Sequence, residues 1–317
     1  MDTLIQQIKE ARPRLRPTSI KSYISHLKKL NKEVGNSDDL FDLGVIKKKE
    51  KIMEFLSSKA KSTRRNYLSS LVVLSMLDEK LEKLTNFYRE NMELLGNELM
   101  EEQKKQTKSA KQEANWTELD ELMNVLADYK KQIDKKKLLK ENALTKSEFD
   151  LIQKWVAGSL YVADVNNNPP LRADFADTKI ISMKEYNELS DDDLKNNYLV
   201  VKSRVKKFLH LGQYKTEGKY GYKIIPMGPT LNKILNAWLR VNKTGWLLVD
   251  SQDKPMSPNQ LTKYIIKVFE PTGKSIGISL IRHIVISHLF PADLQKKQDI
   301  ADKMAHSVDL QTMYAKL

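Results

Sequence analysis

Four cations and one tyrosine are the residues of this sequence whose types could do chemistry. In chain order they are Arg172, Lys215, Arg282, His306 and Tyr314. Arginine, lysine and histidine can meet an anion, and tyrosine can act as a nucleophile. Arg282 is the least ordinary of them, because it lies within an apolar run and a buried guanidinium is costly unless an anion meets it. Taken alone, Arg282 is better explained by an ion pair with an aspartate or glutamate.

Other kinds of site have little support in the sequence. The chain has no cysteine and only five histidines, so thiolate chemistry, disulfides and multi-histidine metal sites are not expected. It also lacks the glycine-rich loops that bind phosphates or dinucleotides and the nucleophile elbow of α/β-hydrolases. Carboxylates that could hold Mg²⁺ occur in two groups, Asp191–Asp193 and the pair Asp174 and Asp177. The first group follows Ser190 and is better explained as helix or turn capping, so neither a metal nor a cofactor is predicted.

The basic excess of the chain is large and unevenly distributed. The 317 residues include 54 Lys plus Arg and 41 Asp plus Glu, which gives a formal net charge of +13 and suggests a polyanionic partner, most commonly nucleic acid. Residues 11–32 hold seven basic and no acidic residues, and residues 200–243 hold ten basic residues and one acidic. Residues 91–150 hold eleven basic and thirteen acidic residues. We therefore expect two basic surfaces that could clamp duplex DNA, separated by a nearly neutral segment.

Two N-terminal segments are predicted to be short helices that open with a hydroxyl residue beside basic residues. Thr18 precedes a helical apolar pattern at residues 20–30, and Thr63 precedes another at residues 67–75. Hydroxyls, helix-end amides and cations together can hold phosphates, although an ordinary helical bundle with a solvated face explains either helix alone. The basic residues that we predict to contact DNA are Arg16, Lys21, Lys61, Arg64 and Arg65, with Lys219 from the second basic segment.

Composition divides the chain into three parts. Residues 1–85 are predicted to form a helical domain, residues 86–115 a charged helix that ends in a linker, and residues 116–317 a larger domain. Apolar or alternating runs in the larger domain predict three antiparallel strands, at 198–201, 206–214 and 222–227, the last two joined by a short turn. Periodic patterns predict helices at 117–131, 145–161, 230–242, 259–269, 278–290 and 297–304. The predicted fold class is mainly α with a small antiparallel β-sheet.

Four stretches of the larger domain resemble, in order and spacing, the boxes of the tyrosine recombinase (phage integrase) family. "PPLRADFADTKI" (169–180) is similar to the first arginine box, and "SLIRHIVISHLF" (279–290) is similar to the second. "MAHSVDLQTMYAKL" (304–317) resembles the closing box with its nucleophilic tyrosine. "YKTEGKYGYKIIPM" (214–227) is a weaker match to the hairpin that carries the active-site lysine. The double-proline arginine box also resembles recombinases of large DNA viruses and related mobile elements.

The resemblance implies a helical, SAM-like core-binding domain followed by a tyrosine-recombinase-like catalytic domain. It implies that Tyr314 attacks a DNA phosphodiester and forms a 3′-phosphotyrosyl intermediate, with no metal or ATP required. Arg172 and Arg282 would hold the nonbridging oxygens of the phosphate through bidentate hydrogen bonds. Lys215 would protonate the 5′-oxygen leaving group, and His306 would donate a hydrogen bond to the same phosphate.

This sequence departs from the family pattern in two places. Ser279 stands where the family commonly has the histidine of His-x-x-Arg, which removes a proton-transfer group but keeps a hydroxyl that can bond a phosphate. His306 precedes Tyr314 by eight positions, where nine is usual. Two predictions concern neighbouring residues of the same types. Lys219 is a rival to Lys215 for the general acid, and His283 and His288 are predicted to be packed rather than catalytic.

The resemblance also predicts partners and leaves two alternative functions. Recombinases of this family act as homo-tetramers on double-stranded DNA with paired inverted-repeat sites, which predicts a DNA-associated protein of a nucleus, nucleoid or viral factory. The chain has no apolar run long enough to cross a bilayer and no secretory signal, so a soluble, intracellular protein without a membrane partner is expected. A type IB topoisomerase shares the catalytic set but typically has a β-rich N-terminal domain. A DNA-binding protein of the same fold with weakened catalysis is the second alternative, and the serine at position 279 favours it.

Overall fold

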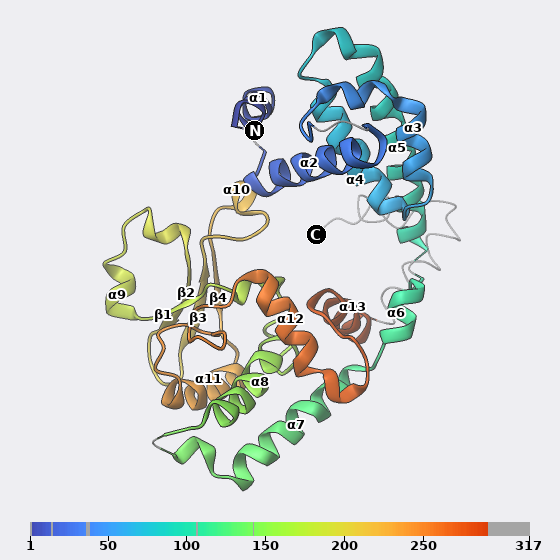
Figure 1. The fold of residues 1–317 in the computed structure, drawn as a ribbon. Helices are drawn as coiled ribbons and strands as arrows, with labels where there is room; N and C mark the ends of the chain where they lie inside the picture. The colour runs from blue at the N-terminus through green and yellow to red at the C-terminus, as the bar shows by residue number, and fades with distance from the viewer. Residues whose placement is uncertain (1, 14, 36–38, 106, 142, 291–317) are drawn as a thin grey trace, which may run out of the picture. The chain divides into compact units, whose positions relative to one another are not determined.

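The chain forms two compact units in a computed structural model, Met1–Lys108 and Ser109–Leu317 (Figure 1). The structure describes residues 2–13, 15–35, 39–105, 107–141 and 143–290. The predicted helix at 297–304 lies outside these residues. None of the helices in the described ranges is both long and apolar enough to cross a lipid bilayer.

The N-terminal unit is built from helices around one apolar core, and its described residues contain no strand. Its α-helices are α1 (Asp2–Ala11), α2 (Pro17–Leu30), α3 (Lys49–Ser57), α4 (Lys61–Ser75) and α5 (Glu82–Lys104). The apolar positions that recur every three or four residues in α2, including Ile20 and Leu27, are buried against α4 residues such as Leu68 and Leu71. Tyr88 of α5 is completely buried, and its hydroxyl donates a 2.7 Å hydrogen bond to the carbonyl oxygen of residue 46.

The starts of α2 and α4 differ from the prediction that a threonine caps each helix. Helix α2 begins at Pro17 with Arg16 at the N-cap position, and no side chain caps it. Helix α4 begins at Lys61, also without a side-chain cap. Proline is favoured at the first position of a helix because its missing N–H would have no partner there, which explains the earlier start of α2. Thr18 and Thr63 therefore lie inside the first turns.

The predicted linker at 86–115 is divided between the two units. Most of it is α5, which packs along α4 and contributes Phe87, Tyr88, Met92 and Leu95 to the N-terminal core. The rest includes a short helix, α6 (Ala110–Asn115), which begins with a capping box between Ser109 and Gln112. The boundary between the units falls at residues 108 and 109.

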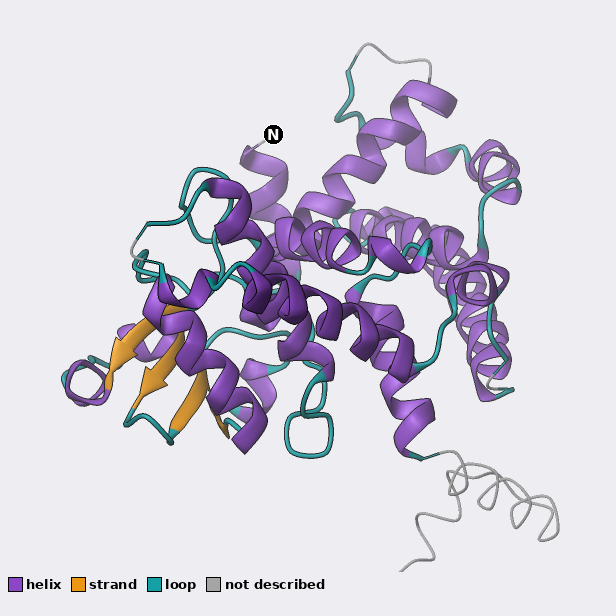
Figure 2. Ribbon diagram, turned by 90° about the horizontal axis from the view of Figure 1, so that it is seen from below, coloured by secondary structure: helices purple, strands orange, loops and turns teal. Residues whose placement is uncertain are grey.

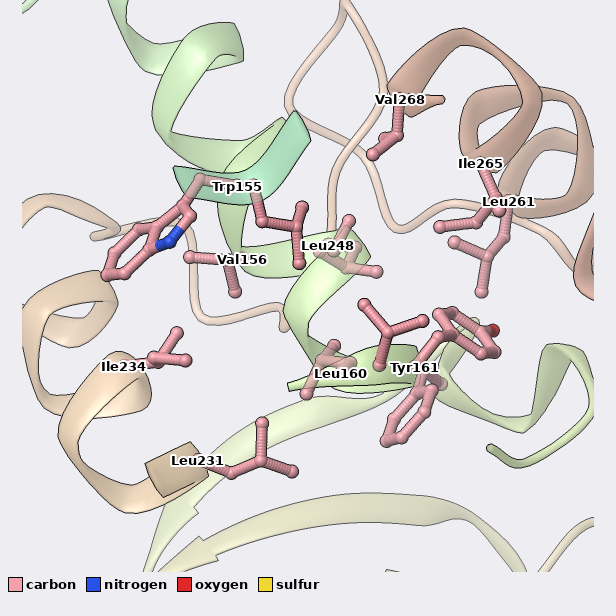
Figure 3. Close-up of a cluster of buried hydrophobic side chains, with 14 of the residues drawn as sticks. Trp155, Val156, Leu160, Tyr161, Leu231, Ile234, Leu248, Leu261, Ile265 and Val268 are labelled. Carbon is pink, nitrogen blue, oxygen red and sulfur yellow. The ribbon is translucent and has the colours of Figure 1, made fainter. Parts of the chain in front are cut away.

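The described residues of the C-terminal unit pack seven further α-helices and a four-stranded sheet around a second core. Beyond α6, its helices are α7 (Leu119–Lys135), α8 (Lys146–Val162), α9 (Met183–Asn187), α10 (Glu217–Tyr220), α11 (Pro229–Val241), α12 (Pro258–Val268) and α13 (Ile278–Leu289). Helix α8 runs through the centre, and capping boxes at Thr145 and Ser257 fix the starts of α8 and α12. Figure 3 shows side chains of α8, α11 and α12 that meet in this core, among them Trp155, Leu160, Tyr161, Leu231, Ile234, Leu261 and Ile265.

The sheet is mixed rather than antiparallel and has four strands rather than three. Its strands, in spatial order, are β1 (Lys179–Ser182), β2 (Asn197–Val201), β3 (Lys207–Leu211) and β4 (Lys223–Pro226), which lie side by side in Figure 2. The β2–β3 and β3–β4 pairs are antiparallel as predicted, whereas β1 pairs with β2 in parallel. Strand β1 was not predicted, because four residues with two adjacent isoleucines show no alternation.

The two faces of the sheet are covered differently. Leu199 and Leu209 face the main core under α8 and α11. Tyr198 and Val200 face the other side, where they form a small cluster with Ile181 and are covered by α9. Because β4 is an edge strand and α9 packs on β1 and β2, the outer face of β4 is the least covered part of the sheet.

We expect Gly212→Ala to destabilise the C-terminal unit, because Gly212, directly after β3, packs against the backbone of residues 194–196 before β2. A Cβ atom at Gly212 would lie 2.0 Å from the carbonyl oxygen of Leu194, and backbone cannot move aside as a side chain can. The expected loss in the free energy of unfolding is about 1–3 kcal/mol, measured by chemical denaturation. Gly218→Ala is the matched control, since a Cβ atom there would meet nothing within 4 Å. Equal stability of the two variants would contradict this packing.

Candidate active site

The loop that carries Arg172 is held in place from two directions. The Asn168 side chain donates a 2.8 Å hydrogen bond to the carbonyl oxygen of Pro226 at the end of β4, and accepts one of 2.6 Å from the Gly228 N–H. From α8, the buried Tyr161 hydroxyl donates to the carbonyl oxygen of Arg172 at 3.0 Å. The Arg172 side chain itself is exposed. The backbone at Arg172 is therefore fixed while its guanidinium faces solvent.

The carboxyl group of Asp174 brings the two arginine boxes into one electrostatic environment. Burial raises the pKa of Asp174, whereas a hydrogen bond from the Arg172 N–H and the charges of Arg172 and Arg282 act to lower that pKa. Arg282 lies on α13, far from Arg172 in the sequence, so the fold brings the charges of both boxes close enough to act on the pKa of one half-buried carboxyl.

The close ion pair expected for Arg282 taken alone is not formed within the described part of the chain. In those residues neither Arg282 nor Arg172 has a carboxylate oxygen within 4.0 Å. Arg282 is half-buried. Asp174 offsets part of the charge of the two arginines at longer range, and both guanidinium groups keep N–H donors that an external anion could use.

A buried asparagine connects the Arg172 loop to the hairpin that carries Lys215. The Asn197 side chain donates to the carbonyl oxygens of Asp174 at 3.3 Å and Gln213 at 3.0 Å, and accepts a 2.9 Å hydrogen bond from the Gln213 N–H. Lys215 lies two residues beyond Gln213, and its side chain is exposed. The hairpin therefore leaves the sheet from a point fixed relative to Arg172.

The connection between β3 and β4 is a structured loop rather than the short turn that was predicted. It contains α10, and Figure 1 shows α10 at the tip of the loop, beyond the end of the sheet. The Tyr214 hydroxyl closes the loop with a 2.7 Å hydrogen bond to the carbonyl oxygen of Gly221, whose φ of 66° and ψ of −168° favour glycine. Lys215 and its rival Lys219 are both exposed in this loop, so either could reach a bound phosphate.

Helix α13 presents one polar face, and the prediction for its histidines is wrong. Ile281 and Val285 are buried, whereas His283 and His288 are exposed. Ser279, the residue at the position of the family histidine, lies three and four residues before Arg282 and His283, so the three side chains share one face. The segment reads as one apolar run, although the helical spacing of Ile278, Ile281 and Ile284 already separates a buried face from a polar one.

Two of the five predicted catalytic residues, His306 and Tyr314, lie outside the residues that the structure describes. The three that it describes do not line the cavity of about 670 Å³ between α8, α12 and residues 249–256. In that pocket the Tyr264 hydroxyl donates to Asp150 at 2.8 Å, and burial raises the pKa of Tyr264. Over the described ranges, no three His, Asp or Glu side chains gather closely enough to hold a metal ion. Arg172, Arg282 and Lys215 instead border open surface.

The predicted DNA contacts of the N-terminal unit do not gather at one end of the α2–α4 pair. The two helices run antiparallel, because Arg12, before α2, contacts Met76, after α4, at 3.6 Å, while His26 stacks on Tyr67. Arg16 and Lys21, at the start of α2, therefore lie toward the C-terminal end of α4. The candidates at its N-terminal end are Lys61, Arg64 and Arg65.

The basic cluster at the start of α4 is largely directed at α5. Lys61 forms ion pairs of 2.8 Å with Glu98 and 2.7 Å with Glu102. The Arg64 Nε atom is buried, and the Arg65 guanidinium lies over Gly96, where an added Cβ atom would be 3.2 Å from Nε. Of the N-terminal candidates, Arg16, Lys21 and Arg65 have exposed side chains.

We expect Arg282→Ala to raise the pKa of Asp174 further, because the variant removes a charge that lowers this pKa. A carboxyl pKa that is raised in the folded state makes the free energy of unfolding fall as pH rises through the interval between the unfolded and folded values. The variant should therefore be destabilised more at neutral than at acid pH.

NMR titration of the Asp174 carboxyl carbon measures its pKa. Chemical denaturation at acid and neutral pH measures how the free energy of unfolding depends on pH. Arg240→Ala, on α11, is the control and should leave the Asp174 titration unchanged. An unchanged pKa in Arg282→Ala would mean that Arg282 is not a neighbour of Asp174.

Comparison with family models, with curated proteins and with solved structures gave no match to this chain. The resemblance to tyrosine recombinases therefore rests on the four stretches of sequence alone.

Proposed function

We propose that this protein is a site-specific DNA recombinase that cleaves and rejoins DNA through a 3′-phosphotyrosyl intermediate. The observation that supports this most is that the charges of Arg172 and Arg282, which come from distant parts of the sequence, both act on the pKa of the partly buried Asp174. The two arginines come from boxes that resemble the family's two arginine boxes. A pair of cations without a carboxylate in close contact is suited to binding a phosphate.

The proposed reaction needs positively charged groups held at fixed positions around the phosphate. The Tyr314 oxygen attacks the phosphorus atom and loses its proton, the bond to the 5′-oxygen breaks, and that oxygen receives a proton. The energy of the broken bond is kept in the phosphotyrosyl link, so the reverse steps rejoin the strand. Arg172 and Arg282 stabilise the negative charge that gathers on the nonbridging oxygens, where a planar guanidinium fits better than an ammonium group.

Lys215 is the proposed general acid for the leaving 5′-oxygen. A lysine can release its proton, unlike an arginine, and the Asn197 bridge fixes the root of its loop relative to the arginines. Ser279 and the exposed His283 lie on the same face of α13 as Arg282 and could both bond the phosphate. His283 would then supply the imidazole that position 279 lacks.

The helical N-terminal unit favours a recombinase over a type IB topoisomerase. Its described residues contain helices and no strand, whereas those topoisomerases typically have a β-rich N-terminal domain. Assembly as a tetramer on paired inverted repeats of duplex DNA is part of the proposal, as is association with DNA in the cell. The remaining alternative, a DNA-binding protein that has lost the reaction, differs from the proposal only in chemistry.

We expect a covalent protein–DNA adduct on nicked duplexes. When cleavage occurs close to a nick, the short fragment that carries the free 5′-hydroxyl diffuses away, so the strand cannot be rejoined and the phosphotyrosyl link is trapped. The protein is incubated with a pool of nicked duplexes of random sequence, and adducts that survive detergent are recovered, sequenced and enriched over repeated rounds. Tyr314→Phe should form no adduct on the enriched sites while keeping its affinity for them. Failure of the wild-type protein to enrich any adduct, or an adduct in Tyr314→Phe, would contradict the proposal.

On an enriched site, Arg282→Ala should slow adduct formation by about 10²-fold or more, the usual effect of losing a donor to a charged transition state. Arg282→Lys should remain slow as well, because it keeps the charge but not the planar pair of donors. Single-turnover kinetics measure both rates, and filter binding shows whether affinity is kept. Full activity in Arg282→Lys would show that Arg282 supplies only charge.

A further inference from the structure

Two exposed tyrosines and an isoleucine form an apolar surface beside the Lys215 loop. Tyr220 ends α10, and Tyr222 and Ile224 follow in and just before β4; their exposed fractions are 58%, 58% and 50%. Ile224 is paired with His210 across the antiparallel β3–β4 ladder, which puts Tyr222 and Ile224 on the outer face of the edge strand. We call Tyr220, Tyr222 and Ile224 the tyrosine face.

One face of the Tyr222 ring packs on a buried histidine. It stacks on the His210 ring, with ring centroids 5.1 Å apart and an interplanar angle of 23°. His210 is completely buried and is fixed by two hydrogen bonds, a 3.0 Å contact between Nδ1 and the Tyr186 hydroxyl and a 2.8 Å bond from Nε2 to the carbonyl oxygen of Leu194. One face of the Tyr222 ring is therefore held by a rigid partner, and more than half of the side chain remains exposed.

Lysines are interleaved with the rings. The Lys223 ammonium lies 5.4 Å from the Tyr214 ring and 5.3 Å from the Tyr220 ring, and the Lys219 ammonium lies 5.1 Å from the Tyr220 ring. Within the described ranges, no carboxylate lies within 4.0 Å of the ammonium group of Lys219 or Lys223. Lys223 pairs with Leu211, so its side chain leaves β4 on the side opposite Tyr222 and Ile224, and the positive charge lies around the edge strand at the Tyr220 ring.

A ligand that matches this face needs a flat apolar surface and a negative charge within a few ångströms of it. Nucleotides have both, and every base can stack on an aromatic ring. Bases in a duplex already stack on one another and offer only their edges in the grooves, so duplex DNA would use the lysines and leave the rings unoccupied. Unpaired bases would use both.

We propose that the tyrosine face binds unpaired nucleotides of DNA, with bases stacked on Tyr220 and Tyr222 and phosphates held by Lys219 and Lys223. This adds a second kind of ligand to a protein proposed to act on duplex DNA. It does not depend on strand cleavage, because the contacts are made by the hairpin alone. Next to the Lys215 loop, such a site would hold nucleotides that leave the helix when a strand is opened.

The test measures the affinity of Tyr314→Phe protein, which cannot form a covalent link, for fluorescent oligothymidylate by anisotropy. The double variant Tyr220→Ser/Tyr222→Ser should bind oligothymidylate about ten-fold or more weakly, since each stacked base contributes substantially to affinity. Tyr220→Phe/Tyr222→Phe should keep the affinity, because it keeps the rings. Val205→Ser is the control: it removes another exposed apolar side chain, 72% exposed, that carries no ring.

Two further probes separate stacking from backbone binding. An abasic oligonucleotide of the same length should bind more weakly than oligothymidylate to the wild-type rings, and duplex affinity should change little in the serine double variant. Equal affinity for abasic and thymidylate strands, or an unchanged affinity in the serine double variant, would overturn the proposal. Equal losses for duplex and single strand would also overturn it, by showing a general change in the hairpin. None of these outcomes depends on whether an adduct forms in the nicked-duplex experiment.

Discussion

The candidate site depends on one buried amide, the side chain of Asn197. It is the first residue of β2, so the sheet fixes its backbone, and its three hydrogen bonds join the Arg172 loop to the end of β3. A buried amide that lost these partners would cost about 1–3 kcal/mol for each unsatisfied group. The Arg172 loop and the hairpin are therefore fixed relative to each other. The exposed side chains of Arg172 and Lys215 extend from backbone segments on either side of this bridge.

Charge in this site is balanced incompletely. Asp174 is one carboxyl with a pKa raised by burial, and two arginines act to lower that pKa although neither has a carboxylate oxygen within 4.0 Å in the described residues. A structural ion-pair network would place acid and base in contact, as Lys61 does with Glu98 and Glu102 in the N-terminal unit. The contrast between these two arrangements is the physical reason to treat the arginines as ligands for an external anion and Lys61 as structural.

The sequence predicted the elements whose signals are local. Thr145 begins α8 with a capping box, and the alternation in β3 and β4 marked the hairpin. Strand β1 was missed because its pairing with β2 comes from the tertiary fold rather than from its own four residues. The exposure of His283 was missed because one dominant apolar face made the whole segment look buried. The partners of Lys61 could not be predicted, since they depend on how α5 packs against α4.

The number of charges along the chain therefore says less about the two basic segments than the interaction partners of their basic residues do. In the N-terminal unit, Lys29 pairs with Glu33 at 2.7 Å and Lys61 with two glutamates, so the charge of these two lysines is offset internally. In the hairpin, Lys219 and Lys223 lie over tyrosine rings, which leave the positive charge unneutralised. Exposed charges gain affinity for phosphates mainly by releasing counterions, and a charge already paired within the protein releases few. A polyanion would consequently gain more from Lys219 and Lys223 than from Lys29 and Lys61.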